Sequence, residues 1–196
     1  RILNEDVYGA THGDVMVRQF DARGWAIYDA DNWAKARKQV MAQTQIFQKL
    51  QAVYLFTAGH TKADTIDELA GKTGIDAAGL TETIQAYNNG LATAAGDPAH
   101  KEPELCHPVQ RPPFYAIDIS VKNSPFFPVP GLTLGGVRVQ GETGLAVNQH
   151  GTPITGLYAA GRTAVGICSN SYISGLSLAD CIFSGRRAGR HAATGT

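Results

Sequence analysis

The stretch from Gly156 to Gly189 constrains the fold of this chain more than any other part of its sequence. It begins with a short apolar strand that ends in glycine, over residues 156–161, and continues through a polar Gly- and Ser-rich loop over residues 166–175. A helix is then predicted over about 176–193. The chain contains 22 Gly, and glycine-rich sequence in a folded chain often marks a close approach of the backbone to a ligand.

The start of this helix carries the strongest local indication of a binding site. The first N–H groups of a helix lack partners within the helix, and the helix dipole places partial positive charge there. The segment Ser174-Gly175-Leu176-Ser177-Leu178 therefore suits an anion, or a ring that becomes anionic on reduction. An ordinary helix start with Ser as its cap is the alternative interpretation.

The body of the same helix is rich in small residues. Gly185 and Gly189 are four residues apart and therefore share one face. Each internal Gly costs about 1 kcal/mol relative to Ala. We therefore expect this face to gain stability by packing tightly against another backbone.

Two hydroxyl groups lie close together in the loop before the helix. Tyr172 and Ser174 are separated by one residue, so both side chains point to the same side if the loop is extended. A Tyr hydroxyl can donate a hydrogen bond to a developing oxyanion or relay a proton. Structural hydrogen bonding explains the same pair.

The remaining sequence predicts a mixture of helices and short strands. Helices are expected at 31–50, from 66 to Gly71 or Gly74, and at 77–91, whereas residues 9–13 are interpreted as polar turns. Strands are expected at 24–28, 53–57 and 112–119, and a hairpin is expected to join 134–139 to 146–147.

Composition argues against several classes of protein. Lys plus Arg and Asp plus Glu number 17 each, a balance that gives no indication of a nucleic acid or anionic membrane partner. No run of 18 apolar residues is present, so no membrane span is expected. The three Cys lie far apart and indicate reduced thiols of a cytoplasmic protein. The six His lack metal-ligand spacing, so no metal is expected.

An ordered set of motifs resembles the FAD flavoproteins of the fumarate reductase and 3-ketosteroid dehydrogenase group. The resemblance covers about residues 63–193 and is strongest over 154–162 and 174–189. The further pieces occur in the order of the family and are Asn4-Glu5-Asp6, Ile66–Ala70, Gly74–Asp76, Thr83–Asn88, Gly96-Asp97, Pro113–Ala116 and Leu134–Gly136.

The resemblance implies an α+β (α/β) fold made of two parts. A capping, substrate-binding domain of helices and a small sheet would span residues 1–125, and the C-terminal segment of a Rossmann-like FAD-binding domain would span 126–196. The G-x-G-x-x-G motif of the family's N-terminal half is absent from this sequence. The polar start at Arg1 is not a signal peptide, and it fits a fragment whose partner is the missing N-terminal FAD-binding segment of the same protein.

The resemblance also assigns residues to FAD. Ala160, Gly161 and Arg162 match the place where the family contacts the ribityl and pyrophosphate groups, although relatives often have Glu where this chain has Arg162. The helix start, Gly175-Leu176-Ser177-Leu178, matches the segment whose N–H groups face the pyrimidine edge of the flavin.

Departures from the family pattern bear on the substrate. Fumarate reductases hold a dicarboxylate with His and Arg and donate a proton from Arg, whereas the matching residues here are Leu132, Tyr172 and Lys101. A dicarboxylate would lose a bidentate partner, whereas an apolar ketone such as a steroid would gain an apolar surface and a hydroxyl group. The resemblance thus implies an FAD-dependent oxidoreductase acting on CH–CH groups, which introduces a C=C bond next to a ketone.

The catalytic assignment follows from the same resemblance. Tyr172 with Ser174 would be the base or proton relay, and Tyr115 would supply a second hydroxyl unless it only packs under the cap. Tyr172-Ile173-Ser174 resembles the Tyr-x-Ser of Δ4-dehydrogenases, which favours the Δ4 over the Δ1 position. The alternatives are a fumarate- or urocanate-type reductase of an unsaturated acid and a non-catalytic binding module.

Overall fold

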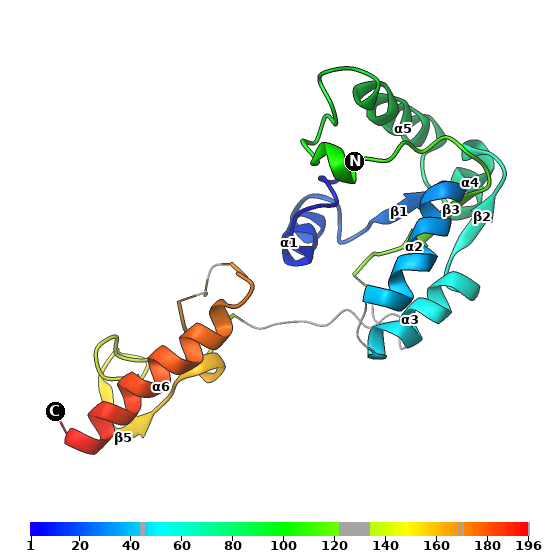
Figure 1. Cartoon of the computed structure of the whole chain (residues 1–196). Coiled ribbons are helices and arrows are strands. Elements are labelled where there is room, and N and C mark those ends of the chain that lie inside the picture. The colour runs from blue at the N-terminus through cyan, green and yellow to red at the C-terminus, as the bar shows by residue number, and fades with distance from the viewer. Residues whose placement is uncertain (44–45, 122–133, 168, 170, 196) are drawn as a thin grey trace. The chain divides into compact units, whose positions relative to one another are not determined.

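Three short strands form the sheet at the centre of the N-terminal part of the chain. They are β1 (Trp25–Tyr28), β2 (Thr61–Ala63) and β3 (Phe114–Asp118). The order is β1-β3-β2 and both pairings are antiparallel, so β3 is the central strand. The computed structural model describes residues 1–43, 46–121, 134–167, 169 and 171–195, without the side chains of 41, 43 and 46–48 (Figure 1).

The chain divides into two compact units, residues 1–129 and 130–196. The boundary predicted after residue 125 lies within 122–133, outside the described residues. Leu132, which the resemblance placed near the substrate, also lies outside them. Each unit is a mixture of helices and a small sheet, in agreement with the expected α+β class.

Five α-helices accompany the sheet in the described part of unit 1. Two of them begin and end where the sequence predicts. The Thr65 hydroxyl caps α4 by accepting the N–H of Glu68 at 3.1 Å, and Gly74 ends that helix in the left-handed conformation. The Asp76 carboxylate caps α5 by accepting the N–H of Gly79 at 2.7 Å. The helices are α1 (Gly9–Gln19), α2 (Ala30–Gln43), α3 (Ile46–Thr57), α4 (Ile66–Thr73) and α5 (Ala77–Leu91).

Three predictions for unit 1 are wrong. The helix expected over 31–50 is two helices, since α2 ends at Gln43 and α3 begins at Ile46. Residues 9–13 begin helix α1 instead of forming polar turns, and no side chain caps this helix, so local signals are weak. Helix α1 is held in place by the buried Met16, whose sulfur would lie only 2.7 Å from a Cβ added to Gly24. Residues 53–57 belong to α3 and not to a strand. A short run of β-branched and aromatic residues fits either a strand or a buried helix, and packing decides.

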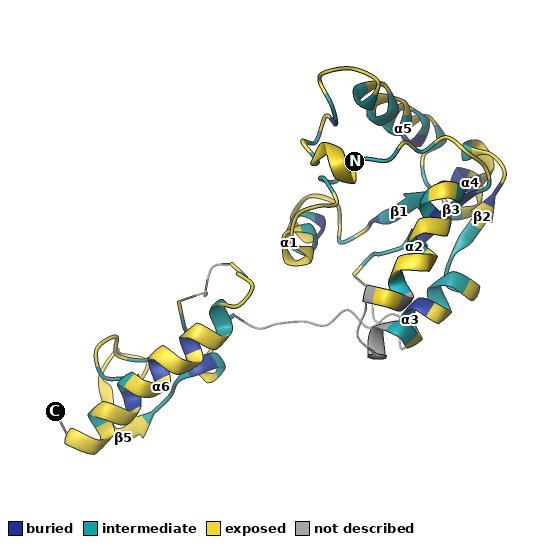
Figure 2. Cartoon of the chain, in the orientation of Figure 1, coloured by how far each residue is buried: buried dark blue, intermediate teal, exposed yellow. Residues whose placement is uncertain are grey.

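The core of unit 1 has two parts on the sheet. Ala63, Leu69, Phe114 and Ala116 form the buried cluster beside α4. Trp33 of α2 is the centre of an aromatic cluster that also contains Tyr28, Phe56, His60 and Tyr115. Figure 2 shows that these helices bury one side and leave the other exposed.

Unit 2 consists of two strands and one long helix in its described part. Strand β4 (Leu145–Val147) pairs antiparallel with β5 (Pro153–Tyr158), and α6 (Leu176–Thr194) packs on them after a 3-10 turn at 161–163. The predicted partner of 146–147 in a hairpin, residues 134–139, contributes only isolated bridges, Val139 with Ala146 and Val137 with Ala164. The strand pairing of β4 is therefore mainly with β5.

The buried face of α6 differs from the predicted one. The buried residues of α6 are Asp180, Ser184 and Ala188. A Cβ added to Gly144 would lie only 2.9 Å from the Cβ of Ala188. Gly185 and Gly189 are exposed, with no heavy atom within 4 Å of an added Cβ. The close backbone approach therefore occurs on the Ala188 face, and the glycine face has no covering in the described residues.

Candidate functional site

The first turn of α6 begins at a residue in an unusual conformation. Gly175 is the N-cap with φ 83°, and no side chain makes a capping hydrogen bond. The Ser-capped start is therefore not observed, although Ser174 immediately precedes the helix. The Leu176 N–H donates to the Ile173 carbonyl and the Leu178 N–H donates to the Gly175 carbonyl, both at 3.2 Å. What this turn presents to a ligand is therefore mainly the partial positive charge of the helix dipole.

The two predicted hydroxyl residues lie in the loop before this helix. Tyr172 is half-buried and Ser174 is exposed. Residues 168 and 170 of the same loop are outside the described part. Tyr172 and Ser174 therefore both precede the uncapped first turn of α6 in the sequence.

The loop that follows β5 is held against the beginning of α6. The buried Gly161, with φ 58°, donates its N–H to Ser184 Oγ at 2.7 Å, and the Ser184 hydroxyl donates to the Asp180 carbonyl at 2.5 Å. A Cβ on Gly161 would lie 2.9 Å from Cys181 Sγ, and one on Gly166 would collide with the Asp180 carboxylate. Loop and helix thus touch backbone to backbone.

This packing brings together the two segments that were assigned to a cofactor. Ala160 and Arg162 are half-buried on either side of Gly161, and residues 175–178 are one turn before Cys181. The two segments therefore lie near the same half of α6, although 12 residues separate them in the sequence.

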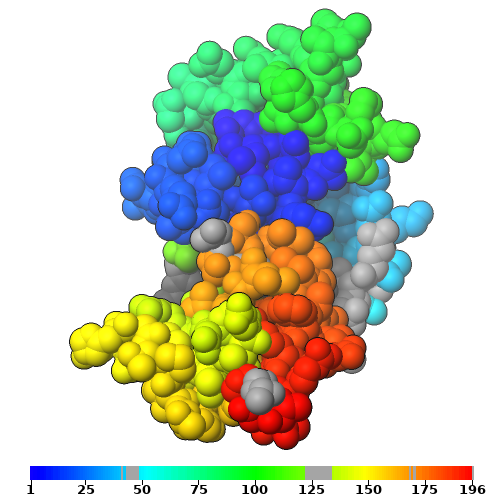
Figure 3. Space-filling model, turned by 90° about the vertical axis from the view of Figure 1, so that its left-hand side faces the viewer, coloured from blue at the N-terminus to red at the C-terminus, as the bar shows by residue number. Residues whose placement is uncertain are grey.

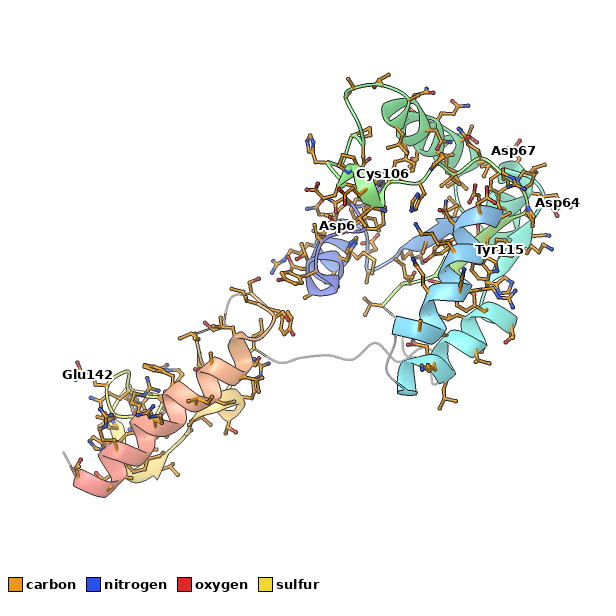
Figure 4. All side chains as sticks on the ribbon, viewed as in Figure 1. Asp6, Asp64, Asp67, Cys106, Tyr115 and Glu142 are labelled. Carbon is orange, nitrogen blue, oxygen red and sulfur yellow. The ribbon has the colours of Figure 1, made fainter. Side chains whose placement is uncertain are left out.

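Tyr115 lies in the other unit and has a packing role there. The Tyr115 ring, labelled in Figure 4, stacks on Trp33 with ring centroids 4.3 Å apart and an interplanar angle of 4°. The His60 ring lies tilted beside it, with ring centroids 5.6 Å apart. Tyr115 belongs to unit 1 and Tyr172 to unit 2.

An ion-pair cluster that sequence reasoning missed joins the N-terminal segment to the loop at 96–101 (Figure 3). The Asp97 carboxylate, 4% exposed, accepts hydrogen bonds from the Arg1 guanidinium, the Ala99 N–H and the Lys101 N–H. Arg1 also pairs with Glu5 at 2.8 Å, and Lys101 Nζ lies 3.3 Å from the same carboxylate. The only signals in the sequence were the motifs Asn4-Glu5-Asp6 and Gly96-Asp97, which carry no pairing information.

The cluster shifts the titration of both carboxyl groups. Burial by itself would raise the pKa of Asp97, but the hydrogen bonds from Arg1 and from two backbone N–H groups outweigh it and hold that pKa below its ordinary value. Burial by itself would also raise the pKa of Glu5. The neighbouring Arg1 and Lys101 outweigh this effect, so the pKa of Glu5 is lowered as well. Both groups are therefore anionic at neutral pH and fix the cationic side chains.

The described residues contain no group of three or more His, Cys, Asp or Glu that could hold a metal ion. No helix among them is both long and apolar enough to cross a membrane. Cys106 and Cys181 are free thiols, and Cys168 lies outside the described part.

Comparison with known proteins connects this site to flavoproteins. Residues 7–177 match the FAD binding domain family. The chain is 33% identical over 162 residues to the 3-oxo-5-alpha-steroid 4-dehydrogenase of Comamonas testosteroni, covering 82% of this chain and 30% of that protein. It is 28% identical to the probable fumarate reductase Ifc3 of Shewanella frigidimarina, covering 98% of this chain and 29% of that protein.

A solved structure shows the same relationship in three dimensions. The 3-ketosteroid-Δ4-(5α)-dehydrogenase of Rhodococcus jostii RHA1, solved with 4-androstene-3,17-dione, superposes with a TM-score of 0.77 at 31% identity. The match covers 99% of this chain and 37% of that one. The present chain thus spans about three tenths of the length of the curated relatives.

Proposed function

Because the chain belongs to the FAD binding domain family, we propose that it is part of an FAD-dependent dehydrogenase that introduces a C=C bond next to the ketone of a 3-ketosteroid. The likeness to two Δ4-dehydrogenases, one of them over 99% of this chain, is the observation that carries the proposal. It favours the Δ4 position over Δ1. The enzyme would be longer than this chain, which covers 30% of the Comamonas relative.

The residues at the start of α6 fit the flavin. Bound FAD supplies an acceptor for a hydride, and its ring gains negative charge near the pyrimidine edge on reduction. The first turn at Gly175 to Leu178 has no side-chain cap, so it offers the partial positive charge of the helix dipole to such an edge. Ala160, Gly161 and Arg162 would contact the ribityl and pyrophosphate region. The remaining phosphate contacts would come from a segment that this chain does not contain.

Unit 2 has the character of one part of a larger domain. Its strand β5 leaves Ile154 and Leu157 41% and 50% exposed, and α6 leaves Leu178 and Ile182 73% and 64% exposed. Burial of a large apolar side chain contributes about 1.5–3 kcal/mol. The missing N-terminal FAD-binding segment of the same protein would cover these residues and complete a Rossmann-like domain. Unit 1 would then be the capping, substrate-binding domain.

The chemical role is assigned to the hydroxyl groups beside the helix start. Tyr172 with Ser174 would be the base or proton relay, because the two residues stand in one loop directly before the flavin-binding turn. The Tyr172 oxygen would take the proton α to the substrate carbonyl as its own hydroxyl proton passes to Ser174, whose hydroxyl proton would leave to solvent. Tyr115 would supply a hydroxyl from the capping side, with its ring held by Trp33. An apolar steroid ketone suits this set because no bidentate partner for a carboxylate is among them.

The test uses the full-length enzyme with Tyr172→Phe. Turnover of a 3-keto-5α-steroid should fall about 10²- to 10⁴-fold, the usual contribution of a positioned acid or base, while the spectrum of bound flavin is unchanged. Tyr158→Phe is the matched control, because the Tyr158 hydroxyl bonds to His191 Nδ1 at 2.7 Å near the other end of α6. Unchanged turnover in Tyr172→Phe would show that the assignment of Tyr172 is wrong.

A second candidate is a reductase of an unsaturated acid such as fumarate or urocanate. The 28% identity to a probable fumarate reductase over 98% of this chain favours it. Stopped-flow reoxidation of the reduced flavin distinguishes the two. Reoxidation by fumarate, with no reduction of the flavin by a 3-ketosteroid, would select the reductase, and a colourless, inert full-length protein would select a non-catalytic binding module.

A further inference from the structure

The overall charge balance hides a local segregation of charge in unit 1. Residues 32–63 contain no Asp or Glu, whereas they contain five basic residues. This acid-free stretch covers nearly all of α2, all of α3 and strand β2. The basic residues are Lys35, Arg37, Lys38, Lys49 and Lys62.

The α2–α3 hairpin combines these cations with exposed apolar side chains. Leu50 is 75% exposed and Val53 is 54% exposed, whereas Ala52 between them is buried. Positions 50 and 53 are three apart and therefore share one face of α3. On α2, Lys35, Arg37 and Lys38 are exposed, and Trp33 is 5% exposed. Figure 2 shows exposed surface along both helices.

The hairpin is fixed from its inner side. Trp33 of α2 packs edge-on against Phe56 of α3, with ring centroids 4.7 Å apart, and stacks on Tyr115 of the sheet. Asp31 and Asp64 flank this acid-free stretch, and Asp31 is paired with Arg111 at 2.8 Å. The outer surface of the hairpin is therefore basic and partly apolar while its inner surface is held rigidly by aromatic packing.

We propose that the outer surface of the α2–α3 hairpin docks on an anionic lipid bilayer. Arg37 and Lys38 would lie among the headgroups, and Leu50 and Val53 would enter the boundary between headgroups and acyl chains. Basic residues together with exposed apolar side chains on a helical surface are the pattern of interfacial binding. A nucleic acid would match the cations but would leave Leu50 and Val53 without a partner. The contact is peripheral and crosses no membrane.

The test is cosedimentation of the full-length protein with vesicles of phosphatidylcholine alone or mixed with phosphatidylglycerol. We expect binding only to the anionic vesicles, weakening as NaCl rises. Each basic residue near an anionic surface strengthens binding about fivefold, so Arg37→Glu with Lys38→Glu should weaken it at least about 25-fold. Leu50→Gln with Val53→Gln should weaken it about tenfold. Trp fluorescence checks that each variant retains the packing of Trp33.

A control variant separates the hairpin from net charge. Arg18→Glu with Arg23→Glu makes the same change of charge at two exposed positions outside the hairpin, and it should bind as the unmodified protein does. The proposal is overturned if the protein binds neither vesicle, binds both equally, or loses binding equally in the control. It is also overturned if single-stranded DNA binds as tightly as the anionic vesicles and Leu50→Gln with Val53→Gln has no effect.

Discussion

The two units bury different kinds of side chain. In unit 1 the buried residues include Met16, Trp33, Leu69 and Phe114, whereas the buried hydrophobic residues described in unit 2 are all Ala, namely Ala146, Ala164 and Ala188. A core of large side chains can stabilise a domain by itself, but a few methyl groups cannot. The difference shows that unit 1 holds the larger hydrophobic core, and it supports the proposal that a further segment covers unit 2.

The largest contrast should appear when one large side chain is truncated in each unit. Leu69→Ala removes a side chain with no exposed surface and should lower the free energy of unfolding of unit 1 by about 2–5 kcal/mol. Ile182 of unit 2 is 64% exposed, so Ile182→Ala should change the free energy of unfolding of unit 2 by less than about 0.5 kcal/mol in this chain. Urea unfolding measures both variants, and equal effects would contradict the comparison.

Gly161 tests one of the tightly packed contacts of unit 2. Gly161→Ala places a methyl group 2.9 Å from Cys181 Sγ at a positive φ, which should cost about 1–3 kcal/mol. Hydrogen exchange of α6 amides should accelerate in this variant, while exchange in β3 stays unchanged. Gly141→Ala is the control, because nothing lies within 4 Å of its added Cβ.

A substitution at Gly185 tests whether the glycine face of α6, which is exposed in this chain, is covered in the longer protein. In this chain Gly185→Ala should stabilise α6 by up to about 1 kcal/mol, because the position is exposed and Ala is the better helix former. In the full-length protein the same change should be destabilising, because the glycine face would contact another backbone. Thermal unfolding of both forms measures the sign, and a stabilising effect in both would show that this face is never covered.

Acid should loosen unit 1 through the Arg1–Asp97 pair. The pKa of Asp97 is lowered in the folded state, so the pair stabilises the fold above the unfolded pKa of about 4 and this contribution is lost as pH falls through the folded value. Asp97→Asn should remove about 1 kcal/mol at neutral pH and make stability less dependent on pH below about 4. Trp fluorescence reports unit 1 alone, because both Trp residues, Trp25 and Trp33, lie in it.

The sequence predicted those elements that local signals determine. Thr65 and Asp76 mark helix starts through their own side chains, and Gly74 marks a helix end, so α4 and α5 were predicted closely. Helix α1 and the end of α3 were missed because the burial of Met16 and the packing of Phe56 on Trp33 decide their structure. The face of α6 that packs was also missed, since the presence of Gly does not say which side a neighbour covers.

The candidate site was predictable to a different extent in each unit. The segments at 160–162 and 175–178 are contiguous motifs at a strand end and a helix start, so the sequence is enough to propose them as a cofactor site, and their contact with FAD stays a prediction. The pairing of Arg1 with Asp97 joins residues 96 positions apart, and no local pattern encodes it. The roles of Tyr172, Ser174 and Tyr115 remain predictions for the variants described above.

Hydrogen exchange of α6 with and without the missing segment tests the central claim most directly. The chain is mixed with FAD and with the N-terminal FAD-binding segment of the same protein, and exchange of residues 176–189 is compared with that of β3. We predict fast exchange in α6 of the chain alone, and protection of α6 together with a bound-flavin spectrum once both components are added. Protection of α6 in the chain alone equal to that of β3, or no gain of protection and no flavin spectrum on mixing, would contradict the account.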